Sequence, residues 1–195
     1  MTEEQRIASA MARVDRRVTK LLTKYEKLKR LILNRKWTGG EEDRIWLEQF
    51  AVGDGMDICP GDFVIGENSI GIDPSDGMIG ADRQMSGDEI SYEEPGSLDY
   101  IVSNYIDVFP DPFKMFRGWH TLLKRGGTLA FTCRNADAFD ELATPCGPLE
   151  NKNRHCLYTP KIVGFYLRRF DFEPKIIGLS EEGKSIRVMA KKGKQ

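Results

Sequence analysis

The chain has 195 residues, of which 40% are hydrophobic, and no apolar run approaches the length needed to cross a bilayer. The N-terminus does not resemble a signal peptide, and the four cysteines lack CxxC spacing, so we expect reduced thiols in a cytoplasmic protein. The net charge of −1 conceals an asymmetry, because residues 1–37 hold 11 Lys and Arg against 4 Asp and Glu. This asymmetry predicts a basic segment, residues 1–37, followed by an acidic domain, residues 38–195.

The basic segment carries a heptad pattern. Its apolar residues alternate in steps of four and three: Ile7, Met11, Val14, Val18, Leu21, Tyr25, Leu28 and Ile32. No glycine or proline interrupts the pattern before Gly39-Gly40, which predicts one long helix. Two interpretations stay open: a coiled coil through residues 7–32, with another copy or a partner helix, and packing on the chain's own domain. Binding of nucleic acid or another anionic surface is less favoured, since such charges usually form a solvated face.

The next stretch contains the elements of a nucleotide cradle. We expect a short helix over residues 41–50, a strand beginning at Gly55, and a second strand over residues 69–72. Gly61, in the turn between the strands, would let backbone N–H groups approach a ligand. Asp73, at the end of the second strand, can accept hydrogen bonds from both hydroxyls of a ribose. The alternative is a buried strand pair joined by ordinary turn residues.

The connections in this part of the chain are short. About eight residues separate the first two strands, and about as many precede a candidate third strand at residues 80–82. A parallel crossover normally takes a dozen or more residues and includes a helix. Full crossover helices therefore do not fit, and the basic segment is a candidate to cover the face that they would occupy.

The second half of the chain alternates strands and helices. We expect a buried strand over residues 97–104, an amphipathic helix over residues 112–123 with Gly126-Gly127 as its C-cap, and another buried strand over residues 128–133. A helix over residues 160–170 and a terminal hairpin of residues 173–179 and 185–190 should follow. The pattern predicts an α/β fold with a Rossmann-like, doubly wound and mainly parallel sheet. We expect an antiparallel C-terminal edge hairpin, reduced N-terminal crossover helices and a long preceding helix.

Several segments of this half resemble a known family. They are Leu98 to Asn104 (LDYIVSN), Pro110-Asp111-Pro112, and Trp119 to Leu129 (WHTLLKRGGTL). They are similar to the D-x-V-x-S-N strand, the P-D-P turn and the R-V-L-K-P-G-G-x-L segment of class I S-adenosylmethionine-dependent methyltransferases of the type 11 kind. The resemblance covers about residues 53–172, and it implies a methyltransferase that uses S-adenosylmethionine and has an unknown acceptor.

The resemblance also assigns cofactor-binding residues. The family's first loop, D-I-G-C-G, is matched by residues 57–61, in which Asp57 and Gly61 agree. Cys59 replaces the first glycine, and Pro60 removes a backbone donor. Asp73 matches the acid that holds the cofactor ribose. The remaining matches fall where the family contacts the adenine and then the methionine end: Asp82, Met85 and Ser86, followed by Asn104 and Tyr105.

Two residues are candidate catalytic bases, Asp107 and His155. The family's L-E-H segment is shortened here to residues 106–109, where Asp107 could substitute, and His155 matches the histidine of an H-x-x-x-Y-T-P segment. Methyl transfer from a sulfonium needs a base only for poorly acidic acceptors. The structural alternative is that Asp107 caps a turn and His155 is a satisfied histidine of the fold. Cys146, His155 and Cys156 lack the spacing of a metal site, so we predict no metal.

Two classes of function remain after this comparison. The first is a small methyltransferase. The second is a methyltransferase-like protein that has lost catalysis and acts as an assembly, virion or regulatory subunit, as the altered glycine loop and the short connections suggest. A dinucleotide-dependent oxidoreductase is disfavoured, because the G-x-G-x-x-G turn is absent from the sequence.

Overall fold

The computed structural model describes residues 41–61, 63–75, 78, 80–90, 94–138 and 155–193. The chain divides into two compact units, Met1–Gly39 and Gly40–Gln195. All described residues belong to the second unit. The predicted long helix, its heptad pattern and its covering role lie outside the described residues.

Light scattering can test the prediction for the basic segment. We expect an oligomer for the full chain and a monomer for a chain that begins at Trp37, because a single helix would leave the apolar stripe of residues 7–32 in water. A monomeric full-length protein would instead mean that the stripe packs on its own domain. The truncation should then lower the melting temperature.

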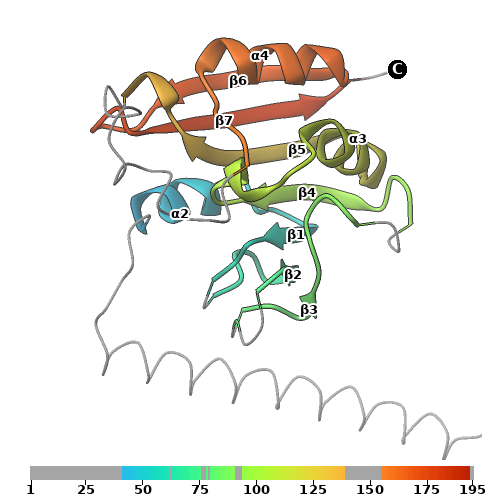
Figure 1. Ribbon diagram of the computed structural model, residues 1–195. Helices are drawn as coiled ribbons and strands as arrows, with labels where there is room; N and C mark the ends of the chain where they lie inside the picture. Colours follow the sequence, from blue (N-terminus) through green and yellow to red (C-terminus); the bar gives the residue numbers. More distant parts are fainter. Residues whose placement is uncertain are drawn as a thin grey trace, which may run out of the picture. The chain divides into compact units, whose positions relative to one another are not determined.

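Seven strands of the described part form one sheet (Figure 1), in the order β3-β2-β1-β4-β5-β7-β6. Their bounds are β1 (Asp54–Ile58), β2 (Asn68–Asp73), β3 (Arg83–Gln84), β4 (Leu98–Ser103), β5 (Leu123–Arg134), β6 (Phe172–Leu179) and β7 (Ser185–Lys192). The first five strands pair in parallel, whereas β7 is antiparallel to both β5 and β6. This arrangement confirms the predicted Rossmann-like, mainly parallel sheet with an antiparallel edge hairpin.

Helices α3 (Pro112–Leu122) and α4 (Pro160–Arg169) begin as predicted. The carboxylate of Asp111 accepts a hydrogen bond from the N–H of Lys114 at 2.9 Å, and the hydroxyl of Thr159 accepts one from the N–H of Ile162 at 3.3 Å. Each of these capping residues precedes a proline. Proline lacks a backbone N–H, but the N–H at the first helical position would have no partner within the helix, so nothing is lost. The other helical segments among the described residues are α2 (Glu41–Glu48) and two 3-10 turns, η1 (Ile106–Val108) and η2 (Ala136–Ala138).

The predicted glycine cap of α3 is wrong. The helix ends at Leu122, and β5 begins at the next residue, Leu123, which pairs with Leu98. Gly126, with φ +71°, lies inside the strand, where the register of the β4–β5 pair shifts. The glycine pair therefore accommodates an irregularity of the sheet, a conformation that a side chain would disfavour.

The connections between β1, β2 and β3 contain no helix among the described residues, in agreement with the predicted reduction. The chain after β2 lies directly on that strand, because a Cβ added to Gly71 would stand 2.0 Å from the carbonyl oxygen of Gly80. Strand β3 is at Arg83–Gln84, slightly later than predicted. The N–H of Asp82 donates to the carbonyl of Gly71 at 2.8 Å, but the regular pairing starts only at the next residue.

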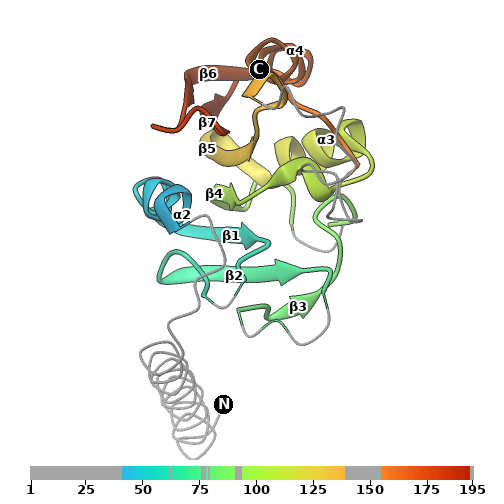
Figure 2. The same ribbon diagram turned by 60° about the vertical axis from the view of Figure 1, so that its left-hand side comes forward.

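Two clusters of apolar side chains cover the two faces of the sheet. Figure 2 shows α2 and α3 on opposite sides of it. The larger cluster includes Phe116 and Trp119 of α3, and the Trp119 indole N–H donates to the carbonyl of Gly87 at 2.8 Å. The smaller cluster includes Leu47 of α2 and Tyr100 of β4. Packing on both faces holds the sheet in place, so the ends of its strands have defined positions.

Candidate functional site

Several of the predicted site residues lie at the carboxyl edge of the parallel strands. Ile58, near the end of β1, lies between Ile72 of β2 and Ser103 of β4. Parallel strands end at the same edge, so the segments that follow these three residues lie side by side. They include four predicted cofactor contacts, which are Gly61, Asp73, Asn104 and Tyr105.

The turn after β1 keeps a left-handed backbone without its first glycine. Cys59 has φ +59° and Gly61 has φ +62°. For a residue with a Cβ, this conformation costs roughly 1–2 kcal/mol. The N–H of Cys59 donates to the carbonyl of Ile72 at 2.7 Å, and the carbonyl of Gly61 accepts from the N–H of Gly80 at 2.9 Å. No described atom lies within 4 Å of a Cβ placed on Gly61, so this side of the turn faces open space.

Asp73 is a fixed carboxylate at the end of β2. Its side chain is buried, with 4% of the residue exposed. One carboxylate oxygen accepts a hydrogen bond from the N–H of Ser75 at 2.8 Å, and its main-chain carbonyl accepts one from the N–H of Met85 at 3.0 Å. An ionised carboxylate can accept several hydrogen bonds. Asp73 is therefore positioned by the protein and able to accept donors from a ligand.

The site is electronegative around Cys59. Burial raises the pKa of the Cys59 thiol, and the charges of Asp73, Asp57 and Asp107 raise this pKa further, while Arg44 opposes them. The thiol therefore stays protonated, which excludes an activated cysteine nucleophile. Asp57 is paired with Arg44, so Asp73 and Asp107 supply the excess negative charge near this turn, which favours a ligand that carries a positive charge.

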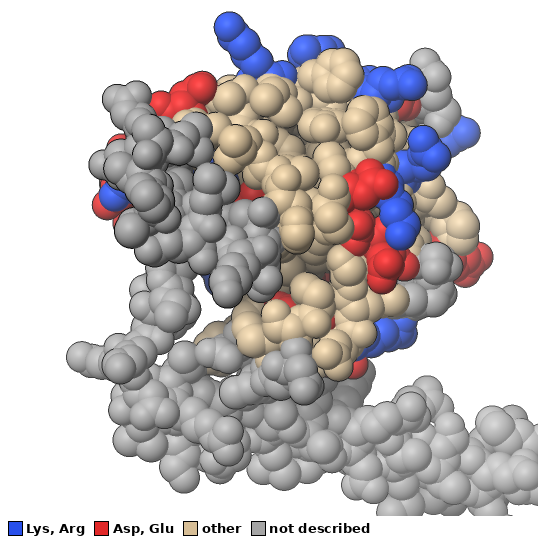
Figure 3. Space-filling view, viewed as in Figure 1, with Lys and Arg blue, Asp and Glu red and all other residues tan. Residues whose placement is uncertain are grey.

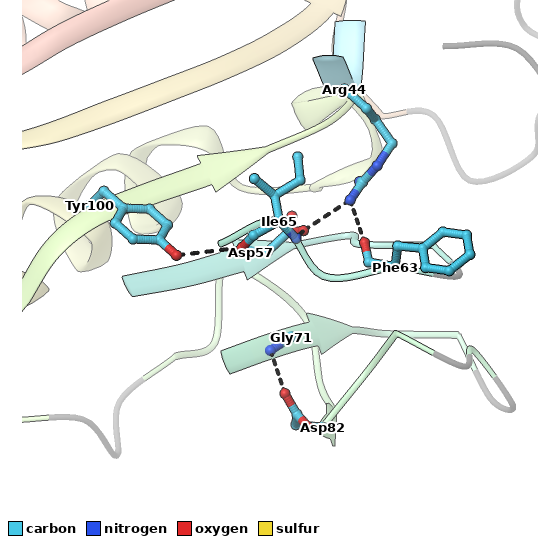
Figure 4. Close-up of polar contacts among 7 residues, drawn as sticks. All are labelled: Arg44, Asp57, Phe63, Ile65, Gly71, Asp82 and Tyr100. Carbon is cyan, nitrogen blue, oxygen red and sulfur yellow. Dashed lines mark hydrogen bonds and ion pairs between the residues drawn. The ribbon is translucent and has the colours of Figure 1, made fainter. Parts of the chain in front are cut away.

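Asp57 lies beneath the turn and is held by the protein itself (Figure 4). Its carboxylate accepts hydrogen bonds from the N–H of Ile65 at 2.7 Å and from the guanidinium of Arg44 at 3.0 Å. Arg44 also donates to the main-chain carbonyl of Phe63. Burial raises the pKa of Asp57 to about 6, against the opposing effects of Arg44 and the Ile65 N–H. Asp57 thus joins α2, β1 and the loop before β2. Sequence reasoning missed Arg44, whose only signal was a single basic residue in a short helix.

Asp82 and Met85 lie at the third strand. Asp82 is exposed, and its carboxylate accepts a hydrogen bond from the N–H of Gly71 at 2.8 Å (Figure 4). This carboxylate therefore replaces a backbone acceptor at the edge of β2. The half-buried side chain of Met85 packs on the larger core cluster, and the Ser86 hydroxyl donates to the carboxylate of Asp88. The backbone N–H of Met85 is hydrogen-bonded to the carbonyl of Asp73. Of the predicted adenine contacts, Met85 is therefore the best placed to contact a ligand held by Asp73.

The segment after β4 is fixed by a residue that sequence reasoning missed. The Thr132 hydroxyl, fully buried in β5, donates to the side-chain carbonyl of Asn104 at 2.6 Å and accepts from the N–H of Tyr105 at 3.2 Å. Tyr105 has a left-handed backbone, with φ +62°. A threonine within an apolar strand gives no sign of this role in the sequence. Thr132 orients both residues predicted to line the methionine end.

The two candidate bases are neighbours in space. The main-chain carbonyl of Asp107, in η1, accepts hydrogen bonds from the N–H of His155 at 2.9 Å and of Cys156 at 3.3 Å. The Asp107 side chain is buried. Burial raises the pKa of the Cys59 and Cys156 thiols, and the charge of Asp107 adds to both shifts. His155 is exposed instead of being packed into the core. The geometry therefore brings both residues to the edge that carries Cys59 and Asp73.

In the part of the chain that the structure describes, no three metal-ligating side chains are grouped closely enough to hold an ion. None of the helices described is long and apolar enough to span a membrane.

Comparison with known proteins identifies the fold. No family model and no curated protein matches the chain. Solved structures do match. The YcgJ protein from Bacillus subtilis has a TM-score of 0.64 and 12% identity, over 80% of this chain and 100% of its own. A SAM-dependent methyltransferase from Archaeoglobus fulgidus has a TM-score of 0.58 and 15% identity, over 77% of this chain and 91% of its own.

A third match was solved with ligands. Geranyl diphosphate C-methyltransferase from Streptomyces coelicolor A3(2), in complex with Mg²⁺, geranyl diphosphate and S-adenosyl-L-homocysteine, has a TM-score of 0.57 and 10% identity, over 79% of this chain and 78% of its own. At these identities the likeness shows the fold alone. The chain has the fold of class I methyltransferases, and its membership of the type 11 family stays a prediction.

Proposed function

We propose that this protein is an S-adenosylmethionine-dependent methyltransferase. One observation carries the proposal: buried Asp73 ends β2 beside the left-handed turn at Cys59 and Gly61, at the carboxyl edge of a methyltransferase-type sheet. Ligands of open α/β sheets bind at this edge. The negative charge around Cys59 also suits the methyl donor, whose sulfonium is positive.

The residues at the edge fit the parts of the donor. Asp73 would accept hydrogen bonds from the ribose hydroxyls, and the open side of the turn at Gly61 would admit the donor close to the backbone. Met85 would contact the adenine, while Asn104 and Tyr105, held by Thr132, would line the methionine end. When bound, S-adenosylmethionine supplies an already activated methyl group.

The protein then has to orient the acceptor and remove its proton. His155 is exposed at the site edge, so its imidazole can take a proton from an acceptor hydroxyl or amine. Asp107 holds the backbone of His155 through its main-chain carbonyl, which makes it a positioning residue for that base. Alignment of donor and acceptor supplies most of the acceleration in an in-line displacement.

The substitution Asp73→Ala tests the proposed donor site. Removing the carboxylate would leave two ribose hydroxyls without a charged acceptor, so donor affinity should fall at least tenfold, on the order of 1.5–3 kcal/mol. Calorimetric titration with S-adenosylmethionine and its demethylated product measures the change. Asp54→Ala, at the exposed opposite end of β1, is the matched control and should bind as the wild type does. Equal affinities in all three proteins would remove Asp73 from the site.

A second candidate function follows from one observation. Cys59 places a Cβ and a thiol in the turn where the family has its first glycine. A protein with this fold that binds no donor would serve as an assembly, virion or regulatory subunit. Titration of the wild type decides between the two: a folded protein that binds neither donor nor product favours the non-catalytic function.

A further inference from the structure

The exposed side of α4 is not covered by any described part of the chain. Its exposed residues are spaced so that they share one side of the helix: Lys161, Ile162, Phe165, Arg168 and Arg169. The opposite side packs inward through Val163, Gly164 and Leu167. The outward side contains no acidic residue. It combines large apolar side chains with three basic ones.

The apolar part of this surface continues onto α3. Phe165 is 53% exposed, Phe113 of α3 is 44% exposed and Ile162 is 39% exposed. The ring of Tyr166 links the two helices, because its centroid lies 5.3 Å from that of Phe113 and 5.7 Å from that of Phe165. A contiguous apolar patch with a polar border marks an interaction site more often than scattered apolar residues do. We call Phe113, Ile162, Phe165 and the three basic residues of α4 the aromatic–basic face.

The basic residues of this face have no carboxylate partner in the described chain. None of the ion pairs formed there involves Lys161, Arg168 or Arg169. Figure 3 shows Lys and Arg side chains along the upper border of an area of uncharged side chains. Burial raises the pKa of Tyr166, and the neighbouring Cys156 and the charge of Asp111 add to this shift, so Asp111 lies near the other border of the face. Residues 38–195 carry a net negative charge, so a cluster of three basic residues differs in sign from the domain as a whole.

We propose that the aromatic–basic face docks the protein on an anionic lipid surface. Exposed aromatic and aliphatic side chains insert at the boundary between headgroups and acyl chains, and neighbouring Lys and Arg contact lipid phosphates. Helix α4, with Phe113 of α3 beside it, presents this face as a convex ridge, which a fluid bilayer accommodates without a preformed groove. Residues 1–37 add a second stretch in which heptad apolar residues accompany an excess of positive charge. The proposal does not depend on methyltransferase activity.

Vesicle sedimentation of the full chain tests the proposal. The protein should bind vesicles of phosphatidylcholine containing about 30% phosphatidylserine and should not bind phosphatidylcholine alone, with binding weakened by salt. The double variant Arg168→Gln, Arg169→Gln should lower the partition coefficient roughly 25-fold, because each basic side chain near an anionic surface contributes a factor of about five. Phe165→Ser should lower it at least about fivefold through lost apolar burial.

Matched controls separate this face from the rest of the chain. Arg83→Gln with Lys184→Gln removes two charges from β3 and from the β6–β7 turn, and Val52→Ser removes an apolar side chain that is 76% exposed. Both controls should bind vesicles as the wild type does. Residues 1–37 are present in every protein, so equal binding by the face variants and the controls would overturn the proposal. Equal binding of neutral vesicles would also overturn it. The proposal would also be overturned if the protein did not bind vesicles but bound single-stranded DNA, and the same substitutions weakened that binding.

Discussion

Replacing Arg44 with methionine should destabilise the fold by about 3–5 kcal/mol near pH 8, because it removes the partner of a buried charge. Asp57 is fully buried, and Arg44 provides one of its two hydrogen bonds. Methionine retains the apolar stem of the side chain but cannot compensate the carboxylate. Urea denaturation at pH 8, followed by circular dichroism, measures the loss.

The loss should depend on pH with a definite sign. Burial raises the folded-state pKa of Asp57 to about 6, above its ordinary value of 3.8. The folded protein therefore holds the proton more tightly than the unfolded chain, and its stability falls by about 3 kcal/mol as pH rises from about 4 to above 6. Without Arg44 this pKa should rise further, so the decline extends to higher pH. At pH 5, where Asp57 is mostly protonated in both proteins, the deficit of the variant should be less than half of that at pH 8.

A second substitution tests the cause of this effect. Adding Asp57→Asn to Arg44→Met removes the uncompensated charge, so the double variant should regain part of the lost stability at pH 8 and lose the pH dependence. Arg117→Met, on the exposed side of α3, is the matched control and should change stability little. An Arg44→Met protein with the same deficit at both pH values would show that lost packing, and not the charge of Asp57, causes it.

His155→Gln should lower turnover by roughly 10² or more while donor affinity stays nearly unchanged. The amide of glutamine cannot take up the proton that the methyl acceptor loses. Single-turnover rates with a methyl-accepting substrate, together with calorimetric titration of the donor, separate the two effects. The prediction applies to acceptors that need a base.

The chain offers one matched control, since its other histidine is His120 at the end of α3. His120 lies 4.0 Å from the carboxylate of Asp171. It is in the last turn of α3, which leads into the amino end of β5, whereas the site is at the carboxyl ends of the strands. His120→Gln should leave turnover unchanged. If His155→Gln instead lowers the melting temperature without a selective kinetic effect, the histidine is structural.

Local signals made most of the fold predictable. The N-caps Asp111 and Thr159, each followed by proline, fixed the starts of α3 and α4. Alternating apolar residues identified the β6–β7 hairpin. The prediction for the end of α3 was wrong because a glycine pair can either cap a helix or accommodate an irregularity in a strand. Only the pairing of Leu123 with Leu98 decides between the two.

Long-range contacts account for what the sequence could not show at the site. Asp57 was assigned to the cofactor loop by motif, but its two hydrogen bonds come from residues 13 positions before it and 8 after it. Thr132 bonds Asn104 across 28 positions, and no local pattern marks such a pair. Asp73 could be placed because the residue that follows an apolar strand is at its carboxyl end in any parallel sheet.

The short connections of the N-terminal half have a consequence for folding kinetics. Pairing Asp54 with Asn68 closes a loop of 14 residues, whereas bringing Lys191 to Thr128 spans 63. Loop-closure entropy grows with the logarithm of length, so the shorter closure costs about 1.3 kcal/mol less. We expect β1 and β2 to pair early and β5 to receive β7 late. The strand ends that carry Gly61 and Asp73 would then assemble before the C-terminal hairpin closes the sheet.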